Sequence, residues 1–294
     1  RRRRQSRRAH RKPGLSMLDH GVPFRLNSRV RRLVAPNPGV MTGAGTNTYL
    51  LGDEEVAVLD PGPAIPAHID AILETAGDRI RWIVCTHTHG DHSPAWQAVA
   101  EATGAEVIGA LPADDMFQDD TFLPTSEVKH DDVLATAEFT LRAVHTPGHV
   151  SNHYCYFLEE EKMLFAGDHI MNGSTVVIVP PSGDMKAYIE SLQKLLLYPL
   201  KLIAPGHGEV MEDSKAVVEW LVNHRLKREN KVMAGLRKTG RTDLDGLVKV
   251  VYDDVDTSLH KMAKLSLSAH LIKLRQENRA LNHPGDDTWE LFEI

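Results

Sequence analysis

The sequence of 294 residues lacks several features that would assign it to particular protein classes. Two cysteines, Cys85 and Cys155, are too few for a disulfide framework and favour a reducing compartment. No apolar run approaches the roughly 18 residues that a membrane-spanning helix needs, so no membrane association is expected. Neither a Gly-x-Ser-x-Gly motif nor a plausible Cys/His pair is present, which argues against a serine or cysteine nucleophile.

Basic residues are scarce outside the first dozen positions. Residues 1–12 hold eight of the 34 Lys and Arg residues and no acidic residue, which leaves 26 basic against 40 acidic residues, a net charge of −14, in the rest of the chain. An acidic body argues against broad nonspecific affinity for nucleic acid. Residues 1–16 are expected to form a disordered basic tail. We expect a cytoplasmic location. Arg-rich segments also occur as targeting presequences, so the mitochondrial matrix is the alternative location.

The most informative stretch is residues 86–92, in which three histidines and an aspartate fall within six positions. Residues 83–85 before it predict a short buried strand. Ser93 and Pro94 after it predict a helix N-cap followed by proline at the first helical position. The cluster is therefore expected where a strand ends and a helix begins.

This spacing predicts a metal site. Residues two apart in an extended segment point the same way, so His87 and His89 can bind one ion together. After Gly90 lets the chain turn, Asp91 and His92 can face a second ion. Imidazole and carboxylate ligands suit zinc, and less exclusively iron or manganese.

Three later motifs, at residues 146–149, 167–168 and 205–208, each follow a short apolar run that predicts a strand. They read Thr-Pro-Gly-His, Gly-Asp and Pro-Gly-His-Gly. Helical and strand patterns alternate through the first half of the chain, which predicts an α/β layered fold. Polar residues at the ends of several strands are expected to converge on one edge of a rigid sheet.

The pattern His-x-His-x-Asp-His, followed by these three motifs, resembles the metallo-β-lactamase superfamily. Within it, residues 37–39 (Asn-Pro-Gly), residues 45–50 and a helical C-terminal extension resemble the β-lactamase-like protein 2 group. The resemblance covers the chain from about Arg29 onward. It implies a four-layer αββα sandwich over residues 17–212 and a small helical, winged-helix-like domain over residues 213–294.

The resemblance also implies a binuclear zinc centre with seven ligands. The first ion would be held by His87, His89 and His149, the second by Asp91, His92 and His207, and Asp168 would bridge the two. Asp91 and Asp168 are the expected catalytic residues. Two ions that share a water lower its pKa to about 7, and the resulting bridging hydroxide would attack a carbonyl or phosphoryl centre.

Spacing alone does not choose between His145 and His149 in the third motif. His145 ends the alternating run of residues 139–144 and can be held by strand pairing. Pro147 and Gly148 then force a turn, because proline fixes φ and glycine permits a positive one. We therefore predict His149 as the ligand, as the resemblance also implies.

Four further residues, Asp60, Asn47, His153 and Gly173, are candidates for supporting the ligands or binding substrate. Asp60 ends a predicted strand at residues 56–59, where it either caps a Pro-Gly turn or holds the histidine loop. Gly173 lies in a Gly/Ser/Pro-rich segment that shapes the pocket or is an ordinary connection. Residues 112–128 are acidic, loop-like and uninformative.

The expected function is hydrolysis of an ester, a thioester or a similar acyl substrate. The subgroup resemblance also implies single-stranded RNA endoribonuclease activity, against which the acidic body argues. A non-catalytic metal-binding or interaction protein is the third alternative, and a missing ligand would mark it, but all seven positions are present. The expected partner is a small acyl substrate or single-stranded RNA, and the sequence leaves monomer and homodimer open.

Overall fold

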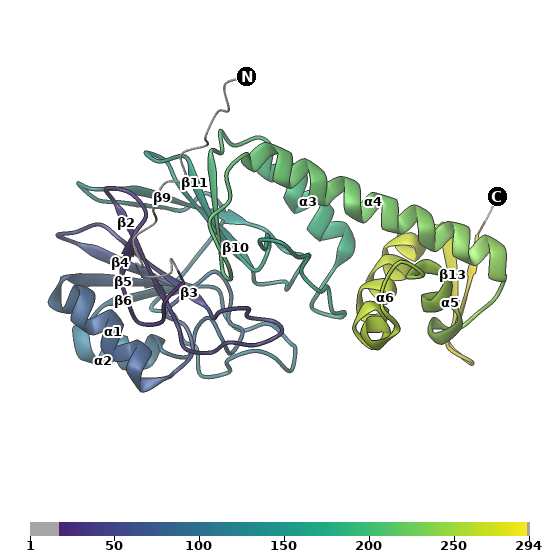
Figure 1. Ribbon diagram of the computed structural model, residues 1–294, viewed down its shortest axis with the longest axis horizontal. Coiled ribbons are helices and arrows are strands. Elements are labelled where there is room, and N and C mark those ends of the chain that lie inside the picture. Colours follow the sequence, from purple (N-terminus) through teal and green to yellow (C-terminus); the bar gives the residue numbers. More distant parts are fainter. Residues whose placement is uncertain (1–17, 293–294) are drawn as a thin grey trace, which may run out of the picture.

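The computed structural model describes residues 18–292, so the predicted basic tail of residues 1–16 lies outside it. Two stacked β-sheets form the larger part of the molecule (Figure 1). The first sheet has seven strands in the order of the sequence. They are β1 (Phe24–Arg25), β2 (Val30–Val34), β3 (Asn47–Leu51), β4 (Val56–Leu59), β5 (Ile80–Val84), β6 (Glu106–Gly109) and β7 (Ser126–Glu127).

The second sheet has five strands in the order β12-β11-β10-β9-β8. Its members are β8 (Val133–Ala135), β9 (Thr140–His145), β10 (Tyr154–Leu158), β11 (Met163–Gly167) and β12 (Leu202–Pro205). Strands β10 and β11 form an antiparallel hairpin, with Leu158 paired to Met163. Strand β12 runs parallel to β11, so both strands end at the same edge of the sheet.

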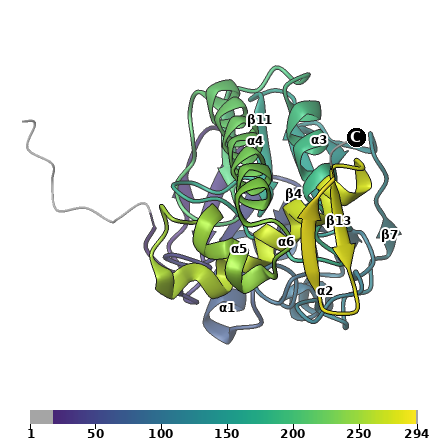
Figure 2. The ribbon, with the colours of Figure 1, turned by 90° about the vertical axis from the view of Figure 1, so that its right-hand side faces the viewer.

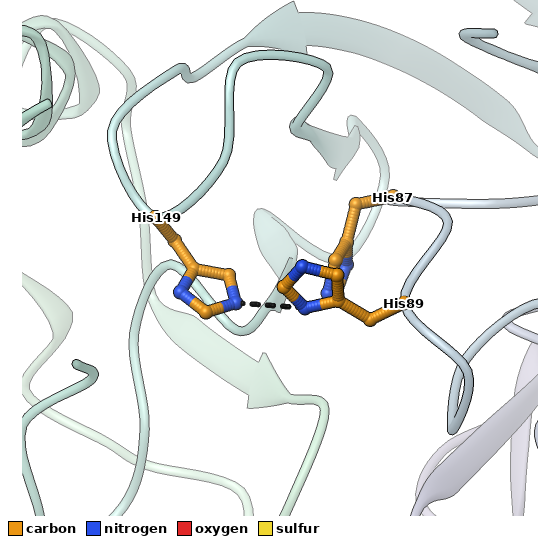
Figure 3. A group of neighbouring side chains, drawn as sticks. All are labelled: His87, His89 and His149. Atoms are coloured by element: carbon orange, nitrogen blue, oxygen red, sulfur yellow. Dashed lines mark hydrogen bonds between the residues drawn. The ribbon is translucent and has the colours of Figure 1, made fainter. Parts of the chain in front are cut away.

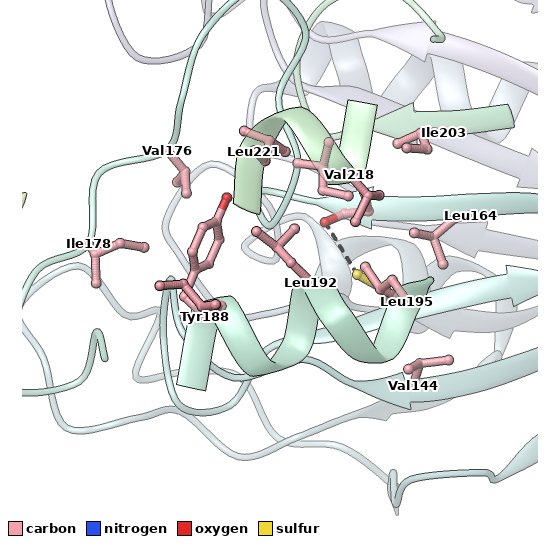
Figure 4. Close-up of a cluster of buried hydrophobic side chains, with 14 of the residues drawn as sticks. Val144, Leu164, Val176, Ile178, Tyr188, Leu192, Leu195, Ile203, Val218 and Leu221 are labelled. Atoms are coloured by element: carbon pink, nitrogen blue, oxygen red, sulfur yellow. Dashed lines mark hydrogen bonds between the residues drawn. The ribbon is translucent and has the colours of Figure 1, made fainter. Parts of the chain in front are cut away.

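Helices cover the outer face of each sheet, which gives the four-layer αββα sandwich. Helices α1 (Pro66–Ala76) and α2 (Trp96–Thr103) share an apolar core with the first sheet. The sheets pack on each other through side chains such as Tyr49 and Phe165, whose ring centroids lie 5.0 Å apart. Helices α3 (Met185–Leu195) and α4 (Ser214–Thr239) cover the second sheet through the core drawn in Figure 4.

The C-terminal unit is built on the far end of the long helix α4 (Figures 1 and 2). It contains α5 (Leu244–Val251), α6 (His260–Gln276) and a hairpin of β13 (Ala280–His283) and β14 (Thr288–Leu291). Its own core includes Leu247 and Trp289. No helix in the described part of the chain is long and apolar enough to cross a membrane.

Two local predictions were wrong. Helix α2 begins at Trp96, not at Pro94, and its N-terminus has no side-chain cap. The hydroxyl of Ser93 donates instead to Asp119 Oδ2 at 2.9 Å, because residues 112–128 fold back over this turn. The C-terminal unit, expected to be helical, ends in two antiparallel strands, β13 and β14, which pair with each other.

Candidate metal centre

Seven polar side chains meet where β5, β9, β11 and β12 give way to loops. Their donor atoms form three overlapping groups, and within each group the atoms lie within 4.8 Å of one another. The groups are His87, His89 and His149; His87, His92 and Asp168; and Asp91, His92 and His207. The structure thus brings together the seven residues that the sequence proposes as ligands, from four segments far apart in the chain.

The first group contains three imidazoles (Figure 3). His149 Nε2 lies 3.1 Å from His89 Nδ1, and the His87 ring centroid is 5.4 Å from that of His149. The opposite nitrogen of His149, Nδ1, lies 3.1 Å from the carbonyl oxygen of Val177. That contact fixes the ring orientation and directs Nε2 toward His89, where a metal ion could bind it.

The group of Asp91, His92 and His207, called the second group from here on, is richer in carboxylate. His207 Nε2 lies 3.2 Å from Asp91 Oδ2 and 3.3 Å from Asp168 Oδ1. His92 Nε2 lies 3.3 Å from the same Asp168 oxygen. The other oxygen of Asp168, Oδ2, is 3.9 Å from His149 Nε2. Asp168 therefore lies between the two groups and presents an oxygen to each.

The hydrogen bonding of several buried polar atoms in this cluster is incomplete. Within residues 18–292, His87 Nε2, His92 Nε2 and Asp168 Oδ1 form no hydrogen bond of regular geometry, even where His92 Nε2 and Asp168 Oδ1 lie 3.3 Å apart, although polar atoms in protein interiors are nearly always paired. These three atoms belong to residues that form one of the groups above. The donor set of imidazole and carboxylate is the one that zinc and related transition metals take. The residues therefore fit one metal ion at His87, His89 and His149 and a second at Asp91, His92 and His207.

Electrostatics differ between the two groups. Burial lowers the pKa of His87 well below its ordinary value and that of His89 to about 4, so both are neutral, as metal ligands must be. Burial also opposes a charge on His92, but the carboxylates of Asp91 and Asp168 outweigh it and raise the pKa of His92 well above its ordinary value. The carboxylates thus favour positive charge at the second group.

Asp60 supports the ligand loop from beneath. The side chain is buried, and Oδ1 accepts from the Thr86 amide at 2.7 Å. Oδ2 accepts from the Thr86 hydroxyl at 2.8 Å and lies 3.0 Å from His92 Nδ1. Of the two readings of Asp60, the contacts favour holding the histidine loop over capping the turn.

Among the described residues, none of the other candidates belongs to a metal-binding group. Asn47 donates to the carbonyl oxygens of Pro205 and Gly208 at 3.0 and 2.8 Å and so holds the His207 loop. The buried His153 packs its ring 5.0 Å from that of His87. Gly173 lines a surface cavity of about 600 Å³ together with Trp220 and helix α4.

His145 is not part of any metal-binding group among the described residues. It ends β9, where its Nε2 lies 3.2 Å from the Ser151 carbonyl oxygen and its ring lies 4.8 Å from that of Tyr154. Gly148 has φ +147°, and the turn carries His149 toward His89. The geometry places His149, and not His145, in the cluster.

Residues 112–128, uninformative in the sequence, contribute to the surroundings of the cluster. Gln118 forms a β-bridge with His89, and the Phe117 ring lies 6.0 Å from the His89 ring. Asp115 Oδ1 is 3.9 Å from His89 Nε2. No periodicity or motif marks this segment. Its carboxylates were the only sequence feature that could have indicated a place near the metal cluster, and carboxylates are common in loops.

Comparison with known proteins gives a consistent result. Residues 41–207 match the family model described as "Metallo-beta-lactamase superfamily", and residues 244–289 match the "Beta-lactamase associated winged helix domain". The "Beta-lactamase-like protein 2 homolog" of Drosophila melanogaster is 32% identical over 87% of this chain and 90% of its own. The "Atrochrysone carboxyl ACP thioesterase" of Aspergillus chevalieri is 30% identical over 89% of this chain and 83% of its own.

Solved structures agree on the architecture. A beta-lactamase domain protein from Burkholderia ambifaria superposes with a TM-score of 0.77 at 20% identity, covering 92% of this chain and 94% of its own. Identity at this level shows the fold alone. The expected fold class and the resemblance to the β-lactamase-like protein 2 group are both confirmed.

Proposed function

The chain belongs to the metallo-beta-lactamase superfamily, whose members are hydrolases, and on this premise we propose that it hydrolyses an apolar acyl thioester or ester with two zinc ions. His87, His89 and His149 would hold one ion, and Asp91, His92 and His207 the other, with Asp168 between them. When bound, such a pair supplies an activated water and a Lewis acid for the carbonyl oxygen. The observation that supports two ions is the position of Asp168, whose oxygens face both groups.

The charge of the surrounding loops favours an acyl substrate over RNA. Six loop segments carry the seven residues or contact them, and none contains a lysine or an arginine. They are residues 36–46, 86–95, 111–125, 146–153, 168–184 and 206–213. Proteins that bind a nucleic-acid backbone do so largely through Lys and Arg. An uncharged carbonyl group needs no such cations, so this absence is the observation that carries the acyl proposal.

Exposed apolar side chains on two of these loops support the same choice. The loop at residues 36–46 contacts His207, because the Gly45 carbonyl oxygen lies 3.2 Å from His207 Nδ1. It carries Val40, which is 98% exposed, and Met41. The loop at residues 111–125 contacts His89 and carries Met116, 87% exposed, and Phe117. Exposed apolar groups beside a polar cluster favour a ligand that is itself partly apolar.

One relative's name points in this direction, since it describes a thioesterase for an acyl carrier protein. We take from it the reaction class, a thioester hydrolysis, and not the particular acyl group. A thioester offers a carbonyl carbon to an activated water and a thiol as leaving group, which suits the residues present. Neither a serine nor a cysteine nucleophile is required.

The test is a panel of substrates offered to the zinc-reconstituted protein. Acyl thioesters of N-acetylcysteamine with two to twelve carbons would be compared with a single-stranded RNA oligonucleotide. We expect kcat/KM to rise with acyl length and RNA to remain intact. Cleavage of RNA in preference to every thioester would contradict the proposal, and inactivity toward both would favour a non-catalytic metal-binding protein.

A further inference from the structure

A buried arginine on helix α4 connects the C-terminal half of the chain to the first metal group. Arg225 is only 4% exposed. Its guanidinium donates to the carbonyl oxygen of Val176 at 2.6 Å and lies 5.1 Å from the centre of the Tyr188 ring. It forms no ion pair with a carboxylate within residues 18–292. A buried charge balanced only by a carbonyl and an aromatic face is costly, so its position needs a reason.

The carbonyl that Arg225 holds is next to the one that orients His149. Val176 and Val177 are consecutive, and the Val177 carbonyl oxygen lies 3.1 Å from His149 Nδ1. An imidazole that donates Nδ1–H to a carbonyl presents a lone pair at Nε2. In this structure that Nε2 faces His89, so the Arg225 contact fixes the peptide segment on which the orientation of His149 depends.

The second contact of Arg225, Tyr188, reaches two ligand loops at once. The Tyr188 hydroxyl donates to the His169 carbonyl oxygen at 2.9 Å, one residue after Asp168. Its backbone also packs closely on Gly148, where an added Cβ would lie 2.3 Å from the Tyr188 Cα, one residue before His149. In Figure 4 its ring lies in the core that α3 and α4 share, near Val176 and Leu221.

We propose that Arg225 is a positioning residue for the first metal group: it holds the segment of residues 176–177 and the Tyr188 ring, and through them sets the orientation of His149 and the place of Asp168. This inference rests on the proposed function, because it assigns a role toward the metal ions. It makes helix α4, which continues into the winged-helix unit, part of the support of the active site.

The same helix provides a matched control. Arg228 makes similar contacts one turn further on, donating to the Val251 carbonyl oxygen at 2.7 Å and lying 4.2 Å from the centre of the Tyr252 ring, and it also pairs with Asp254 at 2.8 Å. Both its carbonyl and its ring belong to the C-terminal unit. Replacing Arg228 therefore removes a carbonyl contact, a ring contact and an ion pair from the same helix without touching a ligand loop.

The experiment compares Arg225→Met with Arg228→Met in the full chain. Zinc affinity is measured by competition with a chromogenic chelator, and amide hydrogen exchange is measured on the metal-free proteins. For Arg225→Met we expect one of the two zinc ions to bind about 10-fold more weakly, the lower end of the usual effect of a residue that supports a ligand. Exchange should also become faster in residues 146–150 and 168–178, and Arg228→Met should change neither quantity.

Arg225→Lys and Tyr188→Phe serve as second variants where Arg225→Met fails to fold. The first keeps the charge but not the planar fork, and the second removes only the bond to His169. Each should weaken the same ion, by less than Arg225→Met. Unchanged zinc affinity and unchanged exchange in folded Arg225 variants would overturn the proposal. Wild-type protein that binds two ions but hydrolyses no acyl substrate would instead contradict the proposed function and leave the role of Arg225 standing.

Discussion

Buried polar groups occur in two parts of the molecule, and their surroundings differ. In the C-terminal unit, Glu229 is 3% exposed and forms ion pairs with Lys273 at 2.7 Å and with Arg279 at 3.0 Å. At the edge of the two sheets, His87, His92 and Asp168 lie close to one another, and within residues 18–292 no lysine or arginine forms an ion pair with any of them.

The different partners of these buried groups indicate different roles, one in stability and one in metal binding. A buried charge that has partners contributes to the fold, and removing one partner leaves the other uncompensated. Imidazoles and carboxylates that converge with no lysine or arginine among them are costly to bury in the metal-free chain, and a bound metal ion offsets that cost. We therefore assign Glu229 to stability and the sheet-edge cluster to metal binding. Substituting Glu229 should lower the free energy of unfolding and leave zinc binding unchanged, whereas substitutions in the cluster should weaken zinc binding.

The largest effect is expected from Asp168→Ala. Because Asp168 faces both metal groups, its loss should lower zinc binding and reduce turnover by more than the roughly 10- to 100-fold typical of residues that merely support a ligand. Turnover and zinc content report the result. Asp70→Ala, at an exposed position on α1, is the control and should change neither. An Asp168 variant that binds both ions and has normal turnover would contradict the assignment of the sheet-edge cluster to metal binding.

A pair of histidine variants sharpens the same point. His149→Ala should lose one ion and nearly all turnover, since His149 belongs to the first group. His145→Ala should retain both ions and change only packing at the end of β9, where its ring lies against Tyr154. Zinc content of the two folded variants decides the assignment, and depletion in the His145 variant alone would reverse it.

Asp60→Asn tests the support of the cluster. The carboxylate accepts from the Thr86 amide and hydroxyl and lies against His92 Nδ1, and an amide cannot accept from all of them. We expect zinc to bind about 10- to 100-fold more weakly at the second group. Chelator competition measures this, and an affinity equal to that of the wild type would show that Asp60 only shapes its own turn.

Glu229→Gln should act on stability alone. Burial would raise the pKa of Glu229, but the nearby His270 ring and Lys273 ammonium outweigh it and lower the pKa from 4.5 to about 2. A lowered folded-state pKa means that the stabilisation is present above the ordinary pKa and is lost as pH falls from about 4.5 toward 2. We expect the variant to lose about 3 kcal/mol of unfolding free energy at pH 7 and to show weaker acid dependence in that window.

Zinc affinity provides the contrast for this variant. Since Glu229 contacts no ligand loop directly, the ions should bind as in the wild type. A Glu229 variant with normal stability at pH 7 but weakened zinc binding would contradict the division between the two regions.

The smallest effect is expected from deleting residues 1–16. The segment has no apolar periodicity and precedes the first predicted strand, so turnover on a small thioester should be unchanged. Steady-state kinetics of the shortened and full chains make the comparison. Loss of turnover in a shortened protein that keeps its zinc and its fold would show that the tail takes part in the reaction.

The fold could be predicted from the sequence because its signals are local. The strand Val56–Leu59 has the expected bounds, and polar motifs follow the apolar strands that present them. The same locality brought His87, His89 and Asp91 to one turn. Their role as ligands stays a prediction, although the structure brings the seven side chains together.

Contacts between distant segments could not be predicted. Nothing in residues 112–128 indicates that Gln118 pairs with His89 or that Asp119 takes the Ser93 hydroxyl and delays the start of α2. Likewise, Arg225 looks like any charged residue of a long helix until the fold brings Val176 to it. Such contacts depend on the path of the loops in three dimensions. Loop residues show no periodicity, so a single sequence does not indicate which distant segment they will contact.

The most direct test of the central claim is a zinc titration of the metal-free protein, followed by both calorimetry and thioester turnover. We predict that two ions bind per chain and that turnover rises until the second ion is bound, because Asp168 faces both the first and the second metal group. Binding of a single ion, or full turnover at one equivalent with no further gain, would contradict it.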